Sequence, residues 1–115
     1  MSKVTNLAFI RARAGRTEEL GERLGRLVAP SRREPGCLRF DLHRADDDPA
    51  LWMVYETWRS PAARQAHYAS AHLRAFIAEA PFLVEGPLDM RGFTPSGPLD
   101  KPRARRLFAD LAALH

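Results

Sequence analysis

Residues 4–12, Val-Thr-Asn-Leu-Ala-Phe-Ile-Arg-Ala, are expected to form a β-strand that is apolar on both of its faces. Side chains alternate across a strand, so one face carries Thr5, Leu7 and Phe9 and the other carries Val4, Asn6, Ala8 and Ile10. A strand with two apolar faces is typical of a central strand that is covered on both sides. The chain must therefore bury both faces of one sheet.

The next elements are predicted from their periodicity and from the residues that interrupt it. Thr17 is expected to cap a helix with an apolar stripe, and Glu34-Pro35-Gly36 is a strong signal for its end. Residues 37–43 alternate between apolar and polar side chains, which indicates a half-exposed outer strand. Residues 51–58 are expected to form a hairpin with that strand.

The second half of the chain is expected to add a helix and a last strand. Ser60 caps this helix and Pro61 opens it, Ser70 kinks or restarts it, and Pro81 ends it. Residues 82–94 are then expected to form an edge strand or a strand with a bulge. After a linker, residues 102–114 have the pattern of a short amphipathic helix.

This order predicts an α+β fold of the ferredoxin-like, split β-α-β type with a four-stranded antiparallel sheet. Residues 1–95 would form the domain, and residues 96–115 the linker and C-terminal helix. Two helices cover only one face of such a sheet. Because the central strands are apolar on both faces, we expect a second copy of the chain to cover the other face, giving a homodimer.

Charge and composition argue against several classes of protein. The net charge is +4, but basic residues are spread along the chain with acidic residues between them, which does not favour nucleic-acid binding. No apolar run approaches the ~20 residues of a membrane span, and no signal region precedes the first strand, so a cytoplasmic location is expected. Cys37 is the single cysteine, which excludes an internal disulfide. Asp46, Asp47 and Asp48 are expected to form a solvated turn.

The candidate site begins with Glu56, in the predicted strand Val54-Tyr55-Glu56-Thr57-Trp58. Glu56 shares a strand face with Trp52, Val54 and Trp58, and a buried carboxylate needs a partner or a proton. It is a candidate to accept a proton or to hold His67 in one tautomer. The alternative is a structural pair with an arginine or a histidine.

His67 lies on the apolar stripe of the second predicted helix. Imidazole changes its charge near neutral pH, so His67 is a candidate base, although a core histidine is also commonly just hydrogen-bonded. His72 lies five residues later, about 140° around an unbroken helix. The two histidines are therefore not expected to share a metal ion, and no metal site is predicted. His72 is a capping or interface residue, or a third candidate for contact with substrate.

Two further residues are candidates for substrate binding. Trp58 could stack on a flat ring or could simply plug the end of the strand. Asn6 projects into an apolar environment, so its amide needs hydrogen-bond partners and could orient a substrate oxygen. Arg32 is expected to form a structural salt bridge.

Three ordered motifs resemble the antibiotic biosynthesis monooxygenase (ABM) family over residues 3–93: residues 30–37, residues 55–58 and residues 66–73. The resemblance implies a dimeric α/β barrel with a cleft between sheet and helices in each subunit. Known members oxidise phenolic or quinol-type compounds with O₂ without flavin, haem or metal. Other members degrade haem, isomerise a phosphorylated sugar or have no known activity.

Particular positions distinguish the branches of this family. The polyketide-oxidising members have an asparagine where this chain has Val54. The haem-degrading members have a tryptophan in place of His67 and a haem-ligating histidine about ten residues on, where this chain has Phe76 and Ile77. The chain is therefore most similar to the quinol-monooxygenase-like branch.

The sequence thus predicts a cofactor-independent monooxygenase acting with O₂ on a quinol- or phenol-type aromatic. His67, oriented by Glu56, would take a proton, while Asn6 and Trp58 would hold the ring and its oxygen. The alternatives are a non-enzymatic small-molecule-binding or stress-associated dimer, and a cofactor-free isomerase that uses the same acid–base pair.

Overall fold

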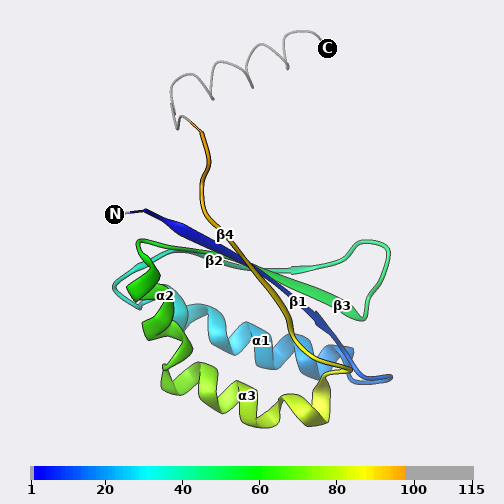
Figure 1. Ribbon diagram of the computed structural model, residues 1–115. Coiled ribbons are helices and arrows are strands. Elements are labelled where there is room, and N and C mark those ends of the chain that lie inside the picture. The colour runs from blue at the N-terminus through cyan, green and yellow to red at the C-terminus, as the bar shows by residue number, and fades with distance from the viewer. Residues whose placement is uncertain (1, 98–115) are drawn as a thin grey trace, which may run out of the picture.

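The computed structural model describes residues 2–97 and shows one antiparallel sheet with helices on one side (Figure 1). The sheet has the strand order β2-β3-β1-β4. The elements, in chain order, are β1 (Val4–Arg11), α1 (Thr17–Arg32), β2 (Cys37–Arg44), β3 (Leu51–Trp58), α2 (Pro61–Tyr68), α3 (Ala71–Leu83) and β4 (Asp89–Phe93). The predicted α+β fold with a split β-α-β arrangement is confirmed.

The central strands of the sheet are β1 and β3, as predicted for β1. They pair along their full lengths, with Asn6 opposite Glu56 and Ala8 opposite Val54. The helix-facing side of both strands is buried, and it carries Val4, Asn6, Ala8, Ile10, Trp52, Val54, Glu56 and Trp58. Two polar side chains, Asn6 and Glu56, are therefore placed next to each other inside an apolar core.

The opposite face of the sheet has no helix on it among residues 2–97 (Figure 1). Thr5, Leu7 and Phe9 of β1 lie on this face, and each is only partly buried. Met53 and Tyr55 of β3 share that face and are partly buried too. The expectation that a second copy covers this surface stays a prediction.

Helix α1 packs on the sheet through Leu20, Leu24, Leu27 and Ser31. The prediction that Thr17 caps this helix was wrong, because Arg16 occupies the N-cap position without a side-chain bond. The Thr17 hydroxyl instead donates a hydrogen bond to the Pro49 carbonyl and accepts one from the Trp52 indole. Thr17 thus connects the start of α1 to the sheet, and it does not cap the N-terminus of the helix.

The second predicted helix is two helices. Ser60 caps α2 as expected, accepting a hydrogen bond from the Ala63 amide. The chain then breaks after Tyr68, and Ser70 caps α3 by accepting a hydrogen bond from the Leu73 amide. Pro81 does not end α3, which continues to Leu83. One missing amide donor near the end of a helix removes only one backbone bond.

Strand β4 is shorter than predicted, and all five of its residues are exposed on the edge of the sheet. Gly86 has a φ of 75° and turns the chain between α3 and β4, which a glycine permits without steric cost. The helix predicted over residues 102–114 lies outside the described residues. Within residues 2–97, no helix combines the length and apolar character that crossing a bilayer requires.

Candidate active site

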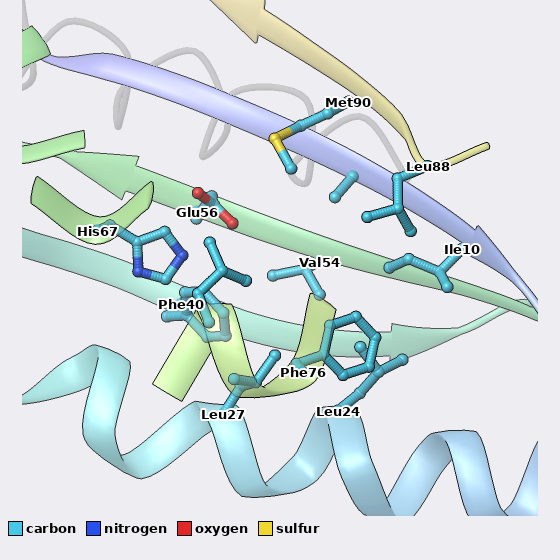
Figure 2. A pocket seen from close by; sticks show the side chains of 12 residues that line it. Ile10, Leu24, Leu27, Phe40, Val54, Glu56, His67, Phe76, Leu88 and Met90 are labelled. Carbon is cyan, nitrogen blue, oxygen red and sulfur yellow. The ribbon is translucent and has the colours of Figure 1, made fainter. Parts of the chain in front are cut away.

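A narrow apolar pocket lies between the helices and the buried face of the sheet, with a volume of about 30 Å³ (Figure 2). Only two of its lining side chains are ionisable, Glu56 and His67. The other lining residues are Ala8, Ile10, Leu24, Leu27, Phe40, Val54, Leu73, Phe76, Leu88 and Met90. The two residues predicted to be catalytic therefore share one cavity.

His67 lies in the last turn of α2 and is 2% exposed. Its ring stacks on Trp58, with ring centroids 4.6 Å apart, and meets the Phe40 ring edge-on at 5.5 Å. Its Nδ1 atom lies 2.7 Å from Oε2 of Glu34. A carboxylate only accepts, so Nδ1 carries the hydrogen, and in the neutral ring the lone pair is on Nε2. Figure 2 shows the outer edge of the ring, which carries Nε2, directed into the pocket.

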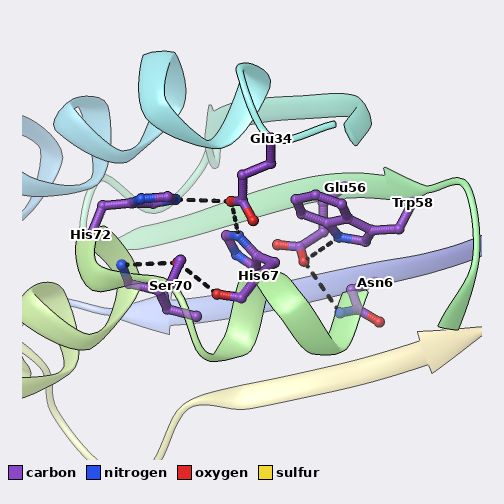
Figure 3. Close-up of polar contacts among 8 residues, drawn as sticks. Asn6, Glu34, Glu56, Trp58, His67, Ser70 and His72 are labelled. Atoms are coloured by element: carbon purple, nitrogen blue, oxygen red, sulfur yellow. Dashed lines mark hydrogen bonds and ion pairs between the residues drawn. The ribbon is translucent and has the colours of Figure 1, made fainter. Parts of the chain in front are cut away.

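The partner of His67 differs from the prediction. Glu56 was expected to orient His67, but its Oε1 atom accepts hydrogen bonds from Trp58 Nε1 at 2.9 Å and Asn6 Nδ2 at 3.2 Å (Figure 3). Glu34 makes the contact instead. From the sequence, Glu34 was predicted only to be part of a helix stop, although it lies inside one of the motifs that carry the family resemblance. A carboxylate in that turn was the one sequence feature that could have indicated a partner for His67.

Glu34 reaches His67 because the turn after α1 packs closely on α2. A Cβ atom added to Gly36 would lie 2.2 Å from the Ala63 Cβ, so only glycine allows this approach. The Gly36 carbonyl also accepts a hydrogen bond from the Arg59 amide. The turn is thus attached to the segment that leads into α2, and Glu34 is brought within hydrogen-bond distance of His67 Nδ1.

His72 contacts the same oxygen of Glu34, with 2.8 Å between Nε2 and Oε2 (Figure 3). The prediction that His67 and His72 point in different directions was wrong. It assumed an unbroken helix, whereas the break at Ser70 lets α3 start in a new direction. His72 does not line the apolar pocket; it lines a separate groove between α1 and α3.

Asn6 and Trp58 lie behind the pocket-lining residues rather than among them. Asn6 Nδ2 also donates to the Tyr68 hydroxyl, and its Oδ1 atom accepts from Arg64 at 3.3 Å. Asn6 therefore has the partners that a buried amide needs. Both residues hold Glu56, whose side chain is buried with neutral hydrogen-bond donors and no arginine or lysine ion pair within residues 2–97.

Arg32 forms a structural salt bridge, as predicted, and Asp48, in the loop predicted to be a solvated turn, forms one too. Arg32 donates to the Phe40 carbonyl and pairs with Asp41, which joins the end of α1 to β2. Asp48 pairs with Arg11 at 2.8 Å and accepts from the Ala50 amide, and the bond from Arg11 lowers the pKa of the Asp48 carboxyl. Asp48 thus attaches this loop to β1 through Arg11.

Cys37 is half-buried at the start of β2. Burial raises the pKa of its thiol, and the neighbouring Glu34 charge raises it further. A thiol held in the protonated form is a poor nucleophile. The structure therefore agrees with a structural role for Cys37.

Residues 3–79 match the protein family described as ABM, antibiotic biosynthesis monooxygenase. The chain belongs to this family. Among its relatives, the Bacillus subtilis protein named "Putative monooxygenase YcnE" is 30% identical over 83 residues, covering 72% of this chain and 87% of that protein. The uncharacterized Synechocystis protein sll1783 is 27% identical over 64 residues, but the match covers only 44% of its length.

Solved structures share the fold over most of the chain. The crystal structure of PA3566 from Pseudomonas aeruginosa is 33% identical and has a TM-score of 0.80, covering 84% of this chain and 97% of that one. The structure of Rv0793 from Mycobacterium tuberculosis is 25% identical and also has a TM-score of 0.80, covering 86% of this chain and all of that one. The ABM ferredoxin-like fold is therefore shared with these structures.

Proposed function

We propose that this protein is a cofactor-independent monooxygenase that oxidises a quinol- or phenol-type aromatic molecule with O₂. The observation that carries the proposal is His67, which presents Nε2 to an apolar pocket while Glu34 holds Nδ1. A base held in one tautomer by a carboxylate is suited to remove a proton from a bound hydroxyl. Membership of the ABM family supports the reaction class.

In the proposed reaction, His67 Nε2 takes the proton of a substrate hydroxyl, and the Glu34 carboxylate stabilises the imidazolium that forms. The electron-rich phenolate transfers one electron to O₂, and the two radicals combine to form a peroxide on a ring carbon. The O–O bond then breaks. One oxygen stays on that carbon as a carbonyl, and the other leaves as water with two hydrogens from the substrate. The substrate supplies all four electrons.

The pocket walls suit such an intermediate, because apolar side chains exclude water around it. The cavity of about 30 Å³ is far smaller than the roughly 300–1,000 Å³ of ordinary ligand sites, so substrate binding requires the walls to open. Met90 lies in the edge strand β4, with Leu88 just before that strand, and Met90 is 39% exposed. We propose that this wall moves, since methionine side chains adapt readily to new neighbours.

The proposal includes a homodimer in which the uncovered sheet face of one copy meets that of another. This face carries the partly exposed apolar side chains of Leu7, Phe9, Met53 and Tyr55. Such a surface is suited to pack against the same apolar face of a second copy. Asn6 and Trp58 position Glu56 for substrate in this scheme. The expected cytoplasmic location and the absence of a nucleic-acid partner stay predictions.

The direct test is O₂ uptake by purified, metal-free protein supplied with reduced quinones and phenols. We expect uptake above background, and a loss of about 10²- to 10⁴-fold in kcat for His67→Ala, the usual contribution of a general base. Gln65→Ala, at an exposed position of the same helix α2, is the matched control. No uptake by the unchanged protein, or equal rates for His67→Ala, would remove the proposal.

The small cavity favours a second candidate function, a non-enzymatic small-molecule-binding dimer. In that case a ligand would bind tightly and be recovered unchanged, with no O₂ consumed. A cofactor-free isomerase is separated by the same assay, because product would form without O₂ uptake.

A further inference from the structure

We propose that Glu34, His67 and His72 form a binding site for a divalent transition-metal ion, with Zn²⁺ as the reference ion. Their three ligand atoms lie within 4.8 Å of one another, and Glu34 Oε2 is 2.7 Å from His67 Nδ1 and 2.8 Å from His72 Nε2. Figure 3 shows both imidazoles directed at this one carboxylate. The site adjoins the apolar pocket through His67, whereas neither Glu34 nor His72 lines that pocket.

Two imidazoles and one carboxylate are a ligand set that zinc accepts, with a fourth position left for water. Metal–ligand bonds of about 2.0–2.2 Å place ligand atoms roughly 3.4 Å apart around a tetrahedral ion. The two distances from Glu34 Oε2 to the histidine nitrogens are shorter than this, because they are hydrogen bonds. The distance between His67 Nδ1 and His72 Nε2 lies within 4.8 Å. To accommodate the ion, the Glu34 carboxylate moves away from both rings, and the two ligating nitrogens come to roughly 3.4 Å from each other.

Burial and charge also favour a cation here. The side chain of His67 is 2% exposed, that of Glu34 is 15% and that of His72 is 24%, so an ion would arrive from the His72 side. Within residues 2–97, the two histidines are the only ion-pair partners of Glu34. A mostly buried carboxylate without an arginine or lysine partner has an unsatisfied preference for positive charge.

Metal binding would alter the pocket through His67. The hydrogen bond to Glu34 requires a hydrogen on Nδ1, whereas a metal bond requires a lone pair there. A neutral ring that binds the ion through Nδ1 therefore carries its hydrogen on Nε2. The nitrogen that faces the pocket changes from proton acceptor to donor. If the proposed function holds, the bound ion switches off the base.

Binding is tested by titrating metal-free protein with CoCl₂ and recording the visible absorption bands of cobalt. We expect one ion per chain and displacement of cobalt by Zn²⁺. Even loss of a partner that only orients a ligand costs about 10- to 100-fold in metal affinity, so His72→Gln should weaken binding at least tenfold. Glu34→Gln is the second variant, in case His72→Gln fails to fold. His43→Gln is the matched control and should bind as tightly as the unchanged chain.

The absence of cobalt bands, or equal binding by the unchanged chain, His72→Gln and Glu34→Gln, would overturn the site. The tautomer is read separately from the ¹⁵N shifts of the His67 ring, where Zn²⁺ should place a hydrogen on Nε2. An unchanged Nε2 signal in the zinc-bound protein would overturn the switch. Neither measurement requires turnover, so failure of the oxidation proposal is distinguishable from failure of this one.

Discussion

Among the individual residues, Glu34 has the greatest influence on how the candidate base is presented. Its Oε2 atom accepts hydrogen bonds from two imidazoles that belong to different helices. Glu56, which lines the apolar pocket together with His67, is held by Asn6 and Trp58 and does not contact either imidazole by a hydrogen bond. The two carboxylates therefore have different roles: Glu34 orients His67, and Glu56 lines the cavity.

Replacing Glu34 with glutamine should slow oxidation while leaving the fold intact. The amide keeps the size of the side chain but not the negative charge that stabilises an imidazolium, so kcat should fall by at least about tenfold. KM should change less, because Glu34 does not line the pocket. Steady-state O₂ uptake measures both constants, and Glu18→Gln, on the exposed start of α1, is the matched control. Equal kcat values for both variants would contradict the role given to Glu34.

Cys37 should react slowly with alkylating reagents at neutral pH. Burial and the Glu34 charge raise the pKa of its thiol, so the reactive thiolate forms only at higher pH than in an exposed cysteine. Iodoacetamide labelling followed by mass spectrometry over a range of pH gives the midpoint. The urea-unfolded chain, as control, should have a lower midpoint. A midpoint at or below that of the unfolded chain would show that the thiol is not suppressed.

Among the elements, α1 shows how a single missing side chain sets a packing distance. A Cβ atom at Gly21 would lie 2.5 Å from the Trp52 ring, whereas one at Gly25 would meet nothing within 4 Å. The indole is held in place by its hydrogen bond to Thr17. Gly21 is therefore required by packing, and Gly25 is not.

The two glycines predict opposite effects of the same substitution. Gly21→Ala should lower the free energy of unfolding by roughly 1–3 kcal/mol, because Trp52 must move in a packed core. Gly25→Ala should raise it by up to about 1 kcal/mol through helix propensity alone. Urea unfolding followed by circular dichroism measures both, and each variant serves as the control for the other. Two changes of the same sign would contradict the packing argument.

The break between α2 and α3 is the element feature with the largest consequence for chemistry. Ser70 accepts from the Leu73 amide and donates to the His67 carbonyl, so one hydroxyl ends one helix and begins the next. An unbroken helix would turn His72 away from His67 by about 140°. The break is what allows both histidines to reach one carboxylate.

At the level of the whole molecule, the sheet has one face under helices and one face open among residues 2–97 (Figure 1). The open face is apolar at its centre, with Leu7 and Phe9 next to Met53 and Tyr55. Exposed apolar surface of this kind is typical of a protein–protein interface, which supports the proposed assembly. The self-complementary solution is a two-fold dimer.

Phe9→Glu should therefore convert a dimer to a monomer. A charge at the centre of a buried interface must be desolvated without a partner, which strongly opposes association. Sedimentation equilibrium should give twice the chain mass for the unchanged protein and one chain mass for the variant. Phe82→Glu is the matched control, because Phe82 is 72% exposed on α3, away from this face. A monomeric unchanged protein, or a dimeric Phe9→Glu variant, would contradict the proposed assembly.

The sequence by itself determined the element order, the Ser60 cap and the face on which Glu56 and His67 lie. These features depend on residues close together in the chain, such as the period of apolar side chains or a serine before a proline. The alternation in residues 51–58 was sufficient to place Glu56 on the same face as Trp52, Val54 and Trp58.

Only the tertiary structure decided which carboxylate meets His67, that His72 joins it, and how small the cavity is. Glu34 and His67 are 33 residues apart, and they meet because Gly36 lets one turn pack against Ala63 of α2. The cavity volume depends on how side chains from both layers fill the space between them. Such contacts join distant parts of the chain, so local periodicity carries no information about their distances.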